Sequence, residues 1–348
     1  MAAYTTIDNP GDFFNILLYT GTGSSNVLTG VGFQSDFIWT ATRNEAEIRP
    51  INDSVNGINS YSRSNADDTL ETTGSNITAQ SSDGYTVGTE DRFNQSSNTF
   101  VSWNWKGGTT SGITTNGSTT ITPSAYSFDQ TAGFSCIKYT GNGSAGAKLA
   151  HGLGAVPDFM IYKHTDETGV WQVYHQTLGN TKWMNLNETD SVQTGSTRWN
   201  DTTPDSVNVT LGTTTYLNKS SGINSAYIFA EKQGYSKFGD YMGNGSSDGL
   251  FVYTGFRPSF LLVKRTDGTA NWVIWDDNRD GYNTTNDELY PNTTAAEGTG
   301  NVYINFYSNG FKWLVTDSMV NGSGDEYIYA AFAHSPLTNS EGVANNAR

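Results

Sequence analysis

Short runs of alternating apolar and polar residues, separated by turn-forming residues, recur along the whole chain. Residues 134–139 (Phe-Ser-Cys-Ile-Lys-Tyr) and 327–333 (Tyr-Ile-Tyr-Ala-Ala-Phe-Ala) are typical of these runs. Turn signals every 8–12 residues or so favour short antiparallel strands packed as sandwiches. Thr, Tyr, Phe and Trp also favour strands, whereas the helix formers Ala, Leu, Glu and Lys are scarce. The pattern therefore predicts an all-β protein.

The chain contains three copies of one sequence pattern. A turn of the form Tyr-x-Gly-x-Gly-Ser occurs at residues 19–24, 139–144 and 241–246. Each turn is followed by a loop and an apolar, strand-like run, at residues 32–39, 152–163 and 255–264. An aromatic alternation closes each copy, at residues 100–105, 227–230 and 327–333. Self-similarity at a regular spacing is the signature of a repeat architecture.

The repeats predict three tandem antiparallel β-sandwich domains of about 100 residues each, a size that supports one small core per domain. The expected organisation is an N-terminal segment with the first sandwich (1–106), a linker hairpin with the second (107–233), the third sandwich (234–335), and a flexible C-terminal tail (336–348). Residues 107–112 are Gly- and Thr-rich, which predicts a flexible linker. Residues 113–121 predict a hairpin around Asn116-Gly117.

Composition and charge exclude several classes of protein. Aromatic residues make up 13% of the chain, which argues against disorder. The formal net charge is −15, which opposes binding to nucleic acid and to anionic membranes. No apolar run approaches the roughly 18 residues of a membrane span, so no membrane insertion is expected. The single cysteine, Cys136, excludes an intrachain disulfide and is predicted to be a core residue.

One segment has the spacing of a calcium-binding loop. Residues 276–287 place oxygen side chains at positions 1, 3, 5 and 12 and glycine at position 6, as an EF-hand loop does. The ligands would be Asp276, Asn278, Asp280 and Asp287. A structural turn is the competing interpretation, because Arg279 lies inside the segment and a strand-like run precedes it. Calcium is thus an alternative, and no other cofactor is expected.

Two kinds of residue are candidates for contact with a glycan or a protein partner. Trp183 and Trp199 lie in polar surroundings, and an indole presents an apolar face and one hydrogen-bond donor. Asn142 and Asn244 lie in the repeated turns, where Asn-Gly is also a common structural turn. The tryptophans in apolar runs are predicted to be core residues: Trp39, Trp103, Trp272 and Trp313.

Signals of catalysis are sparse, and no catalytic residue is predicted. The four histidines are dispersed, and the chain has no nucleophile elbow, phosphate loop or dinucleotide fingerprint. A carboxylate pair for glycan cleavage cannot be found from sequence, because its members meet only in the fold. Solvated loops are the expected setting of the available carboxylates: Glu45, Glu47, Asp166, Glu167, Asp325 and Glu326. The chain is therefore expected not to be an enzyme.

The repeat pattern resembles a domain of marine bacteriophage virion proteins, of the cyanophage and pelagiphage type, that are often labelled tail fibres. The resemblance covers about residues 12–335. Its most typical stretches are residues 103–108, 231–239, 272–276 and 289–292. It implies a virion structural protein, assembled in the host cytoplasm and displayed on the virion surface as a tail fibre or receptor-binding appendage.

The resemblance also implies partners. These are other virion proteins and a host cell-surface glycan or protein, with a homo-oligomer, a trimer first, as the expected assembly. Only about a dozen residues precede the first repeat, so no long adaptor for docking to a tail is expected. A capsid-surface decoration or head fibre protein is therefore the alternative, and a glycan-degrading tailspike is a further one.

Overall fold

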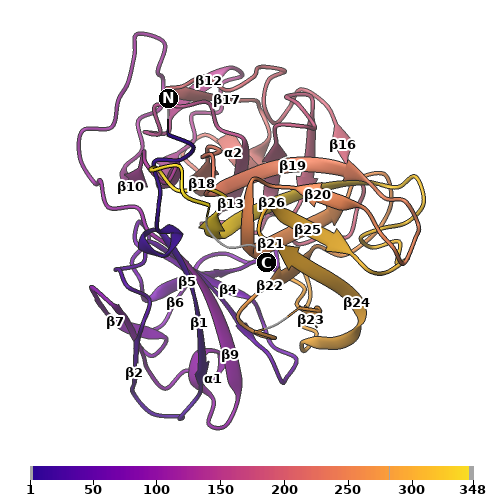
Figure 1. The fold of residues 1–348 in the computed structure, drawn as a ribbon. Coiled ribbons are helices and arrows are strands. Elements are labelled where there is room, and N and C mark those ends of the chain that lie inside the picture. Colours follow the sequence, from indigo (N-terminus) through magenta and orange to yellow (C-terminus); the bar gives the residue numbers. More distant parts are fainter. Residues whose placement is uncertain (1–2, 282, 345–348) are drawn as a thin grey trace.

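The computed structural model describes residues 3–281 and 283–344, and its regular elements are almost entirely β-strands. The named strands pair antiparallel, which confirms the all-β prediction (Figure 1). The short helical elements are η1 (Pro10–Asp12), α1 (Asp91–Asn94) and α2 (Thr215–Asn218). None of the helices in the described ranges has the length and apolar character needed to cross a membrane.

The first unit (1–106) is a sandwich of two sheets. Its large sheet has the order β1 (Phe14–Thr20), β9 (Thr99–Trp105), β3 (Phe37–Thr42), β4 (Pro50–Asp53), β5 (Ser60–Arg63) and β6 (Glu71–Thr72). Its small sheet has the order β2 (Asn26–Thr29), β8 (Gly84–Val87) and β7 (Ile77–Ser81).

The second unit (107–233) is built in the same way. Its large sheet has the order β10 (Ala125–Asp129), β11 (Phe134–Thr140), β18 (Ile223–Phe229), β13 (Phe159–His164), β14 (Gln172–His175), β15 (Lys182–Asn185) and β16 (Gln193–Thr194). Its small sheet pairs β12 (Ala147–Ala150) with β17 (Asn208–Leu211).

The third unit (234–335) again has two sheets, and its last strand runs one residue beyond the predicted boundary. The large sheet has the order β19 (Ser236–Met242), β26 (Glu326–Pro336), β21 (Phe256–Arg265) and β22 (Val273–Asp276). The small sheet has the order β20 (Phe251–Tyr253), β25 (Gly310–Trp313), β24 (Gly298–Tyr307) and β23 (Thr285–Glu288).

The three units share one strand order. In each large sheet the strand that leads into the repeated turn pairs with the unit's last strand, which pairs with the strand after the loop, as in β1-β9-β3, β11-β18-β13 and β19-β26-β21. Each small sheet contains the equivalent pair β2-β8, β12-β17 or β20-β25. A tandem repeat predicts this agreement, although the origin of the units by repetition stays a prediction.

Each sandwich encloses an apolar core of its own, which we call its outer core. The packing follows the pleat: Leu28, Leu149 and Val252 occupy matching inward positions on the three small sheets. Alternation along a strand sends every second side chain to the same face, so the intervening residues face outward. The outer cores account for one face of each large sheet.

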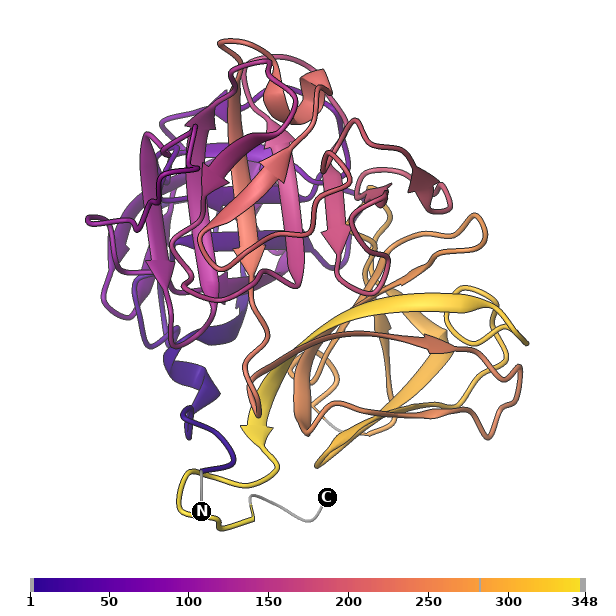
Figure 2. The same cartoon turned by 90° about the horizontal axis from the view of Figure 1, so that it is seen from above.

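The opposite faces of the three large sheets meet in a fourth core, which we call the central core. At its middle lie Trp105, Phe229 and Phe332, one from the last strand of each unit. Their ring centroids are 6.2, 5.3 and 5.5 Å apart, so each ring contacts the other two. The three occupy matching positions, because their register partners are the equivalent phenylalanines Phe37, Phe159 and Phe260. The units are therefore arranged around a pseudo-threefold axis, not in a row (Figures 1 and 2).

Backbone hydrogen bonds connect the units in a ring. At each junction, the backbone carbonyl of the residue that follows β3, β13 or β21 accepts a hydrogen bond from a loop of another unit. The bonds are Leu70 N–H to Thr165 O (2.9 Å), Val192 N–H to Thr266 O (2.8 Å), and Glu297 N–H to Arg43 O (2.7 Å). These bonds join the first unit to the second, the second to the third, and the third to the first, so the ring is closed within one chain.

The first three residues of the predicted flexible linker, 107–109, are held by hydrogen bonds, so the prediction is wrong for them. The buried amide of Gly107 donates to the Asp36 carboxylate (2.8 Å), and Gly108 donates to the Ser127 hydroxyl (2.7 Å). Thr109 then bridges to Phe128. The hairpin predicted over 113–121 is also wrong. A turn does form at Asn116, but the flanking residues pair with other parts of the second unit.

The described part of the predicted flexible tail contacts the N-terminal segment. Ser340 donates from its backbone amide (2.7 Å) and its hydroxyl (2.6 Å) to the Asp8 carboxylate. Residues 345–348 of the predicted tail lie outside the described residues. The flexibility of the tail stays a prediction.

The central core predicts that the three units unfold together. Replacing Trp105 with Ala leaves a cavity that the other two units also line, and such a change costs about 3–5 kcal/mol. We expect calorimetry to show one transition in the parent chain, shifted as a whole to lower temperature in Trp105→Ala, and unshifted in the exposed-site control Val27→Ala. Three separate transitions, or a shift of only one of them, would contradict the shared core.

Candidate functional site

The two predicted asparagine contacts are exposed but belong to a structural turn. Asn142 Oδ1 accepts a hydrogen bond from the Ser144 amide (2.9 Å), and Asn244 Oδ1 accepts one from the Ser246 amide (3.0 Å). Such bonds between a side chain and the backbone two residues on stabilise turns. The structural interpretation of the repeated turn accounts for both residues.

A second, buried asparagine holds each repeated turn; we call these residues, Asn94, Asn218 and Asn321, the locking asparagines. Each side-chain oxygen accepts from the middle residue of a Gly-x-Gly turn, namely Thr22 (2.8 Å), Asn142 (2.9 Å) or Asn244 (3.0 Å). Each side-chain amide donates to the carbonyl of the turn's serine, Ser24, Ser144 or Ser246. The same amide donates to a second carbonyl, that of Gly88, Gly212 or Val315. The bonding pattern is thus the same in all three units.

The two positions of each turn require glycine for different physical reasons. In the second unit, a side chain at Gly141 would overlap the backbone carbonyl oxygen of Lys219. Gly143 has φ of +73°, the left-handed region that favours glycine. The other two turns show the same pair of constraints. The turn therefore recurs because the framework requires it.

The prediction that Trp183 and Trp199 are surface contacts is wrong. Only 8% of Trp183 and 1% of Trp199 are exposed, and both belong to the second unit's outer core. The Trp199 indole donates to the Lys182 carbonyl (2.9 Å), and the Arg198 guanidinium lies 4.0 Å from the Trp183 ring centroid. The polar residues next to each tryptophan in the sequence pack beside the indole rings, and the rings stay buried. The core predictions are confirmed for Trp39, Trp103, Cys136, Trp272 and Trp313.

Three of the four predicted calcium ligands form hydrogen bonds within the protein. Asp276 is fully buried and accepts hydrogen bonds from Trp103 Nε1 (3.0 Å) and Arg279 Nε (2.6 Å). Asn278 donates to the Ile16 carbonyl (3.2 Å). Asp280 accepts from the backbone amides of residues 286 (2.6 Å) and 287 (3.1 Å). A strand, β22, precedes the segment, where an EF-hand has a helix.

The fourth predicted ligand, Asp287, pairs with a cation from another unit. Its carboxylate lies 3.2 Å from the Arg43 guanidinium of the first unit. Within the described ranges, which omit residue 282 of this loop, no group of three or more acidic, histidine or cysteine side chains is placed to hold a metal ion. The structure therefore gives the calcium interpretation no support and favours the structural turn.

These residues form an ionic cluster between the first and third units, made of Arg43, Asp276, Arg279, Asp287 and Glu297. Glu297 lies between the two arginines, at 2.7 Å from Arg43 and 2.9 Å from Arg279. The hydrogen bond from Arg43 and the charge of Arg279 outweigh burial and lower the pKa of Glu297. Burial, followed by the charges of Glu297 and Asp280, raises the pKa of Asp287 to about 7. The sequence gives no signal for the partnership of Arg43 and Glu297, which are 254 residues apart.

Two buried lysines outside the cluster also belong to junctions. Lys163 donates to the Asp67 (3.0 Å) and Gly169 (2.7 Å) carbonyls, and Lys264 donates to the Thr189 (3.3 Å) and Arg265 (2.7 Å) carbonyls. Burial lowers the pKa of each lysine to about 8. Because each binds carbonyls that belong to a unit junction, these amines connect units and are not free nucleophiles.

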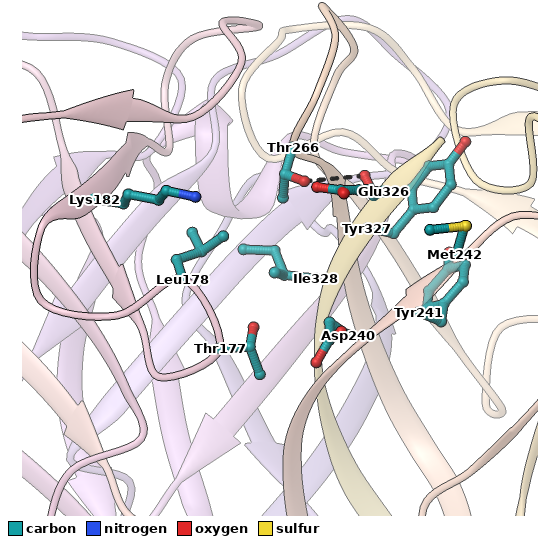
Figure 3. Close-up of a pocket in the computed structure, with 10 residues that line it drawn as sticks. All are labelled: Thr177, Leu178, Lys182, Asp240, Tyr241, Met242, Thr266, Glu326, Tyr327 and Ile328. Atoms are coloured by element: carbon teal, nitrogen blue, oxygen red, sulfur yellow. Dashed lines mark hydrogen bonds between the residues drawn. The ribbon is translucent and has the colours of Figure 1, made fainter. Parts of the chain in front are cut away.

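A polar hollow of about 190 Å³ opens between the second and third units (Figure 3). Lys182, Thr177 and Leu178 line it from the second unit, and the third unit contributes Asp240 and Glu326, among others. Glu326 is one of the carboxylates considered from sequence, and it is exposed, as is Asp240. The arrangement offers one amine and two carboxylates to a small polar ligand.

The chain belongs to the family described as a domain of unknown function, DUF7483, whose model matches residues 9–336. The matched range covers all three units, so the family corresponds to the complete ring and not to a single sandwich. No curated protein and no solved structure matches the chain significantly.

The locking asparagines predict a contrast between two variants of one turn. Asn218→Ala removes four hydrogen bonds of a buried side chain, at about 1 kcal/mol each, so we expect a loss of about 2–4 kcal/mol. Asn142→Ala removes one exposed bond, and we expect a loss below about 1 kcal/mol. Chemical denaturation of both variants measures the difference. Equal losses would show that the buried asparagine does not hold the turn.

The raised pKa of Asp287 predicts a pH-dependent stability. Between its ordinary pKa of 3.8 and about 7, the folded chain holds a proton that the unfolded chain has lost. The contribution of this proton to stability is therefore full below pH 3.8 and is lost as the pH rises through 7. The Asp287→Asn variant cannot titrate at this position. We therefore expect the difference between its melting temperature and that of the parent to increase, in favour of the variant, as the pH rises from 4 to 8. The exposed-site control Asp240→Asn should show no such increase. A constant difference across this range would contradict the assignment.

Proposed function

We propose that this chain is a structural component of a bacteriophage particle, displayed on the virion surface, and that it serves attachment to the host. The proposal rests on the resemblance of its repeats to virion proteins. It also rests on the contrast between a framework that recurs in the three units and outer surfaces that differ between them. It names other virion proteins and a host-surface glycan or protein as partners.

The observation that carries the proposal is the separation of a closed framework from unequal outer surfaces. The repeated turns and the central core use residues that recur in the three units, and the junctions use backbone groups at matching positions. The outward positions of the small sheets differ between units; for example, Val27 matches Lys148 and Phe251. A rigid scaffold that presents variable surfaces is what an adhesion protein needs.

The carboxylates support a binding role over a catalytic one. Cleavage of a glycosidic bond requires one carboxyl group that its surroundings keep protonated. In the hollow of Figure 3, the side chains of Asp240 and Glu326 are exposed to solvent. The carboxyl with a pKa near 7, Asp287, is paired with Arg43 inside the ionic cluster. We therefore propose that the chain is not an enzyme, and the tailspike is the weaker alternative.

The shape supports a second candidate role. The three units form a compact ring with a pseudo-threefold axis, whereas a fibre shaft is elongated (Figure 1). A compact body suits the tip of an appendage, and it also suits a decoration or head fibre protein on the capsid surface. The two roles differ in location and copy number.

The assembly of several chains rests on the resemblance alone. Uncovered apolar surface would be a physical reason for a homotrimer, but the inner faces of the three large sheets cover one another within the chain. The trimer stays a prediction, for which light scattering of the purified chain gives the mass.

Cryo-electron microscopy of the particle tests the proposed location. We expect the compact three-lobed body at the tail, in a dozen to a few tens of copies. Hundreds of copies on the icosahedral lattice would favour the capsid role, and absence from the particle would reject both. A second assay incubates the purified chain with host polysaccharide and counts new reducing ends. Turnover that a single carboxylate substitution abolishes would establish the tailspike instead.

A further inference from the structure

The small sheet of the third unit exposes aromatic rings on its outer face. Phe251 and Tyr253 of β20 are 40% and 54% exposed, and Tyr303 of β24 is 39% exposed. Tyr307, also on β24, is half-buried and packs edge-on against Phe251, with ring centroids 5.9 Å apart. In Figure 1 these strands lie in the third unit, on either side of β25. Large aromatic residues are normally buried, so their exposure on neighbouring strands calls for an explanation.

The pleat fixes the outward direction of these rings. Val252 and Ile304, which alternate with them along β20 and β24, are buried in the third unit's outer core. A shift of register by one residue would bury the aromatic rings and expose the aliphatic core. The rings are thus held on the surface by the packing beneath them, without contributing to that core.

The other two units fold without aromatic residues at the matching positions. Val27 and Lys148 correspond to Phe251, and Thr29 and Ala150 correspond to Tyr253, by their pairing within the small sheets. The shared fold therefore does not require rings here. Their presence in one unit alone points to a local function.

Polar groups lie among the rings. Lys312 of β25 is the register partner of both Phe251 and Asn305, and its amine is paired with Asp248. Asn305 donates to the Tyr307 hydroxyl (3.3 Å), and its side-chain oxygen is buried, with no hydrogen-bond partner among the described residues. The face thus combines flat apolar surfaces with hydroxyl and amide groups.

The size of the face favours a small ligand over a protein. An aromatic side chain has about 150–250 Å² of surface, so the three exposed rings present roughly 300 Å² together. A stable protein interface needs about 800 Å² from each partner. A short stretch of saccharide fits the smaller area, since sugar rings stack their C–H faces on aromatic rings and their hydroxyls bond to amides and phenols.

We propose that this face, defined by Phe251, Tyr253, Tyr303, Asn305 and Tyr307, binds a neutral saccharide chain. Neutrality follows from charge, because a protein with a net charge of −15 repels an acidic polysaccharide. On the face itself, the one amine is already paired with Asp248. The site deepens the proposed function, on which its biological meaning rests, by placing glycan contact on the third unit.

The test measures binding of the full chain to defined hexasaccharides. Chitohexaose and cellohexaose are the neutral probes, and an alginate hexasaccharide is the acidic contrast, each titrated to millimolar concentration by calorimetry. We expect saturable binding of at least one neutral probe and weaker or no binding of the acidic one. Loss of one stacking ring in Phe251→Ala or Tyr253→Ala should weaken binding about tenfold, which corresponds to about 1.4 kcal/mol.

Two control variants separate stacking from general damage. Val27→Ala, at the position of the first unit that matches Phe251, should leave binding unchanged, and Tyr303→Phe, which keeps the ring, should retain most of it. Unaltered melting temperatures would show that all variants fold. The site is rejected if neither neutral probe binds, if the acidic probe binds better, or if the alanine variants bind like the parent.

Two further outcomes have distinct meanings. A concentration-dependent increase in mass that Phe251→Ala abolishes would mean that a second copy of the chain covers this face, and would overturn the saccharide proposal. Saccharide binding that depends on Phe251, found in a chain absent from virus particles, would support the site and reject the proposed function. The two proposals can therefore fail separately.

Discussion

The contact among Trp105, Phe229 and Phe332 is the constraint on which the rest of the structure depends. Each ring comes from the last strand of its unit, and each contacts the other two. A large sheet that places one of these rings at the axis has both of its faces buried, one against its small sheet and one against its neighbours. Burial of both faces is consistent with the aromatic content of 13%, since many of the rings lie in the central core.

The junctions between units follow from that central contact. Once the sheets meet, their edge loops lie side by side, and backbone groups that would otherwise lose water are paired across each junction. The polar side chains that complete each junction differ from one junction to the next. A lysine amine enters the junction at Lys163 and again at Lys264, whereas the matching residue of the first unit is Ala41, and the arginines of the ionic cluster join the first unit to the third. The charges of the cluster are buried but paired, which is the condition for keeping ions away from water.

The repeated motifs predicted the strand-rich class and the framework turns, because these depend on local geometry. The closed ring was not predicted, since contacts such as that of Arg43 with Glu297 have no local signature. One signal was present: residues 159–162 are apolar without alternation, as expected of a strand buried on both faces. Trp199 was misplaced because its sequence neighbours are polar, whereas its burial depends on strands far away in the chain. The spacing of residues 276–287 matched calcium ligands, but Arg279 supplies the positive charge that an ion would bring.

The order of the units along the chain has a consequence for synthesis. Phe332, which completes the central triangle, lies in the last strand of the last unit. While a ribosome makes the chain from its N-terminus, the inner aromatic faces of the first two sheets must wait for the third to cover them. Exposed apolar sheets are prone to associate with other chains. The nascent protein therefore passes through a stage in which protection by a chaperone, or rapid completion of translation, decides how much of it reaches the native state.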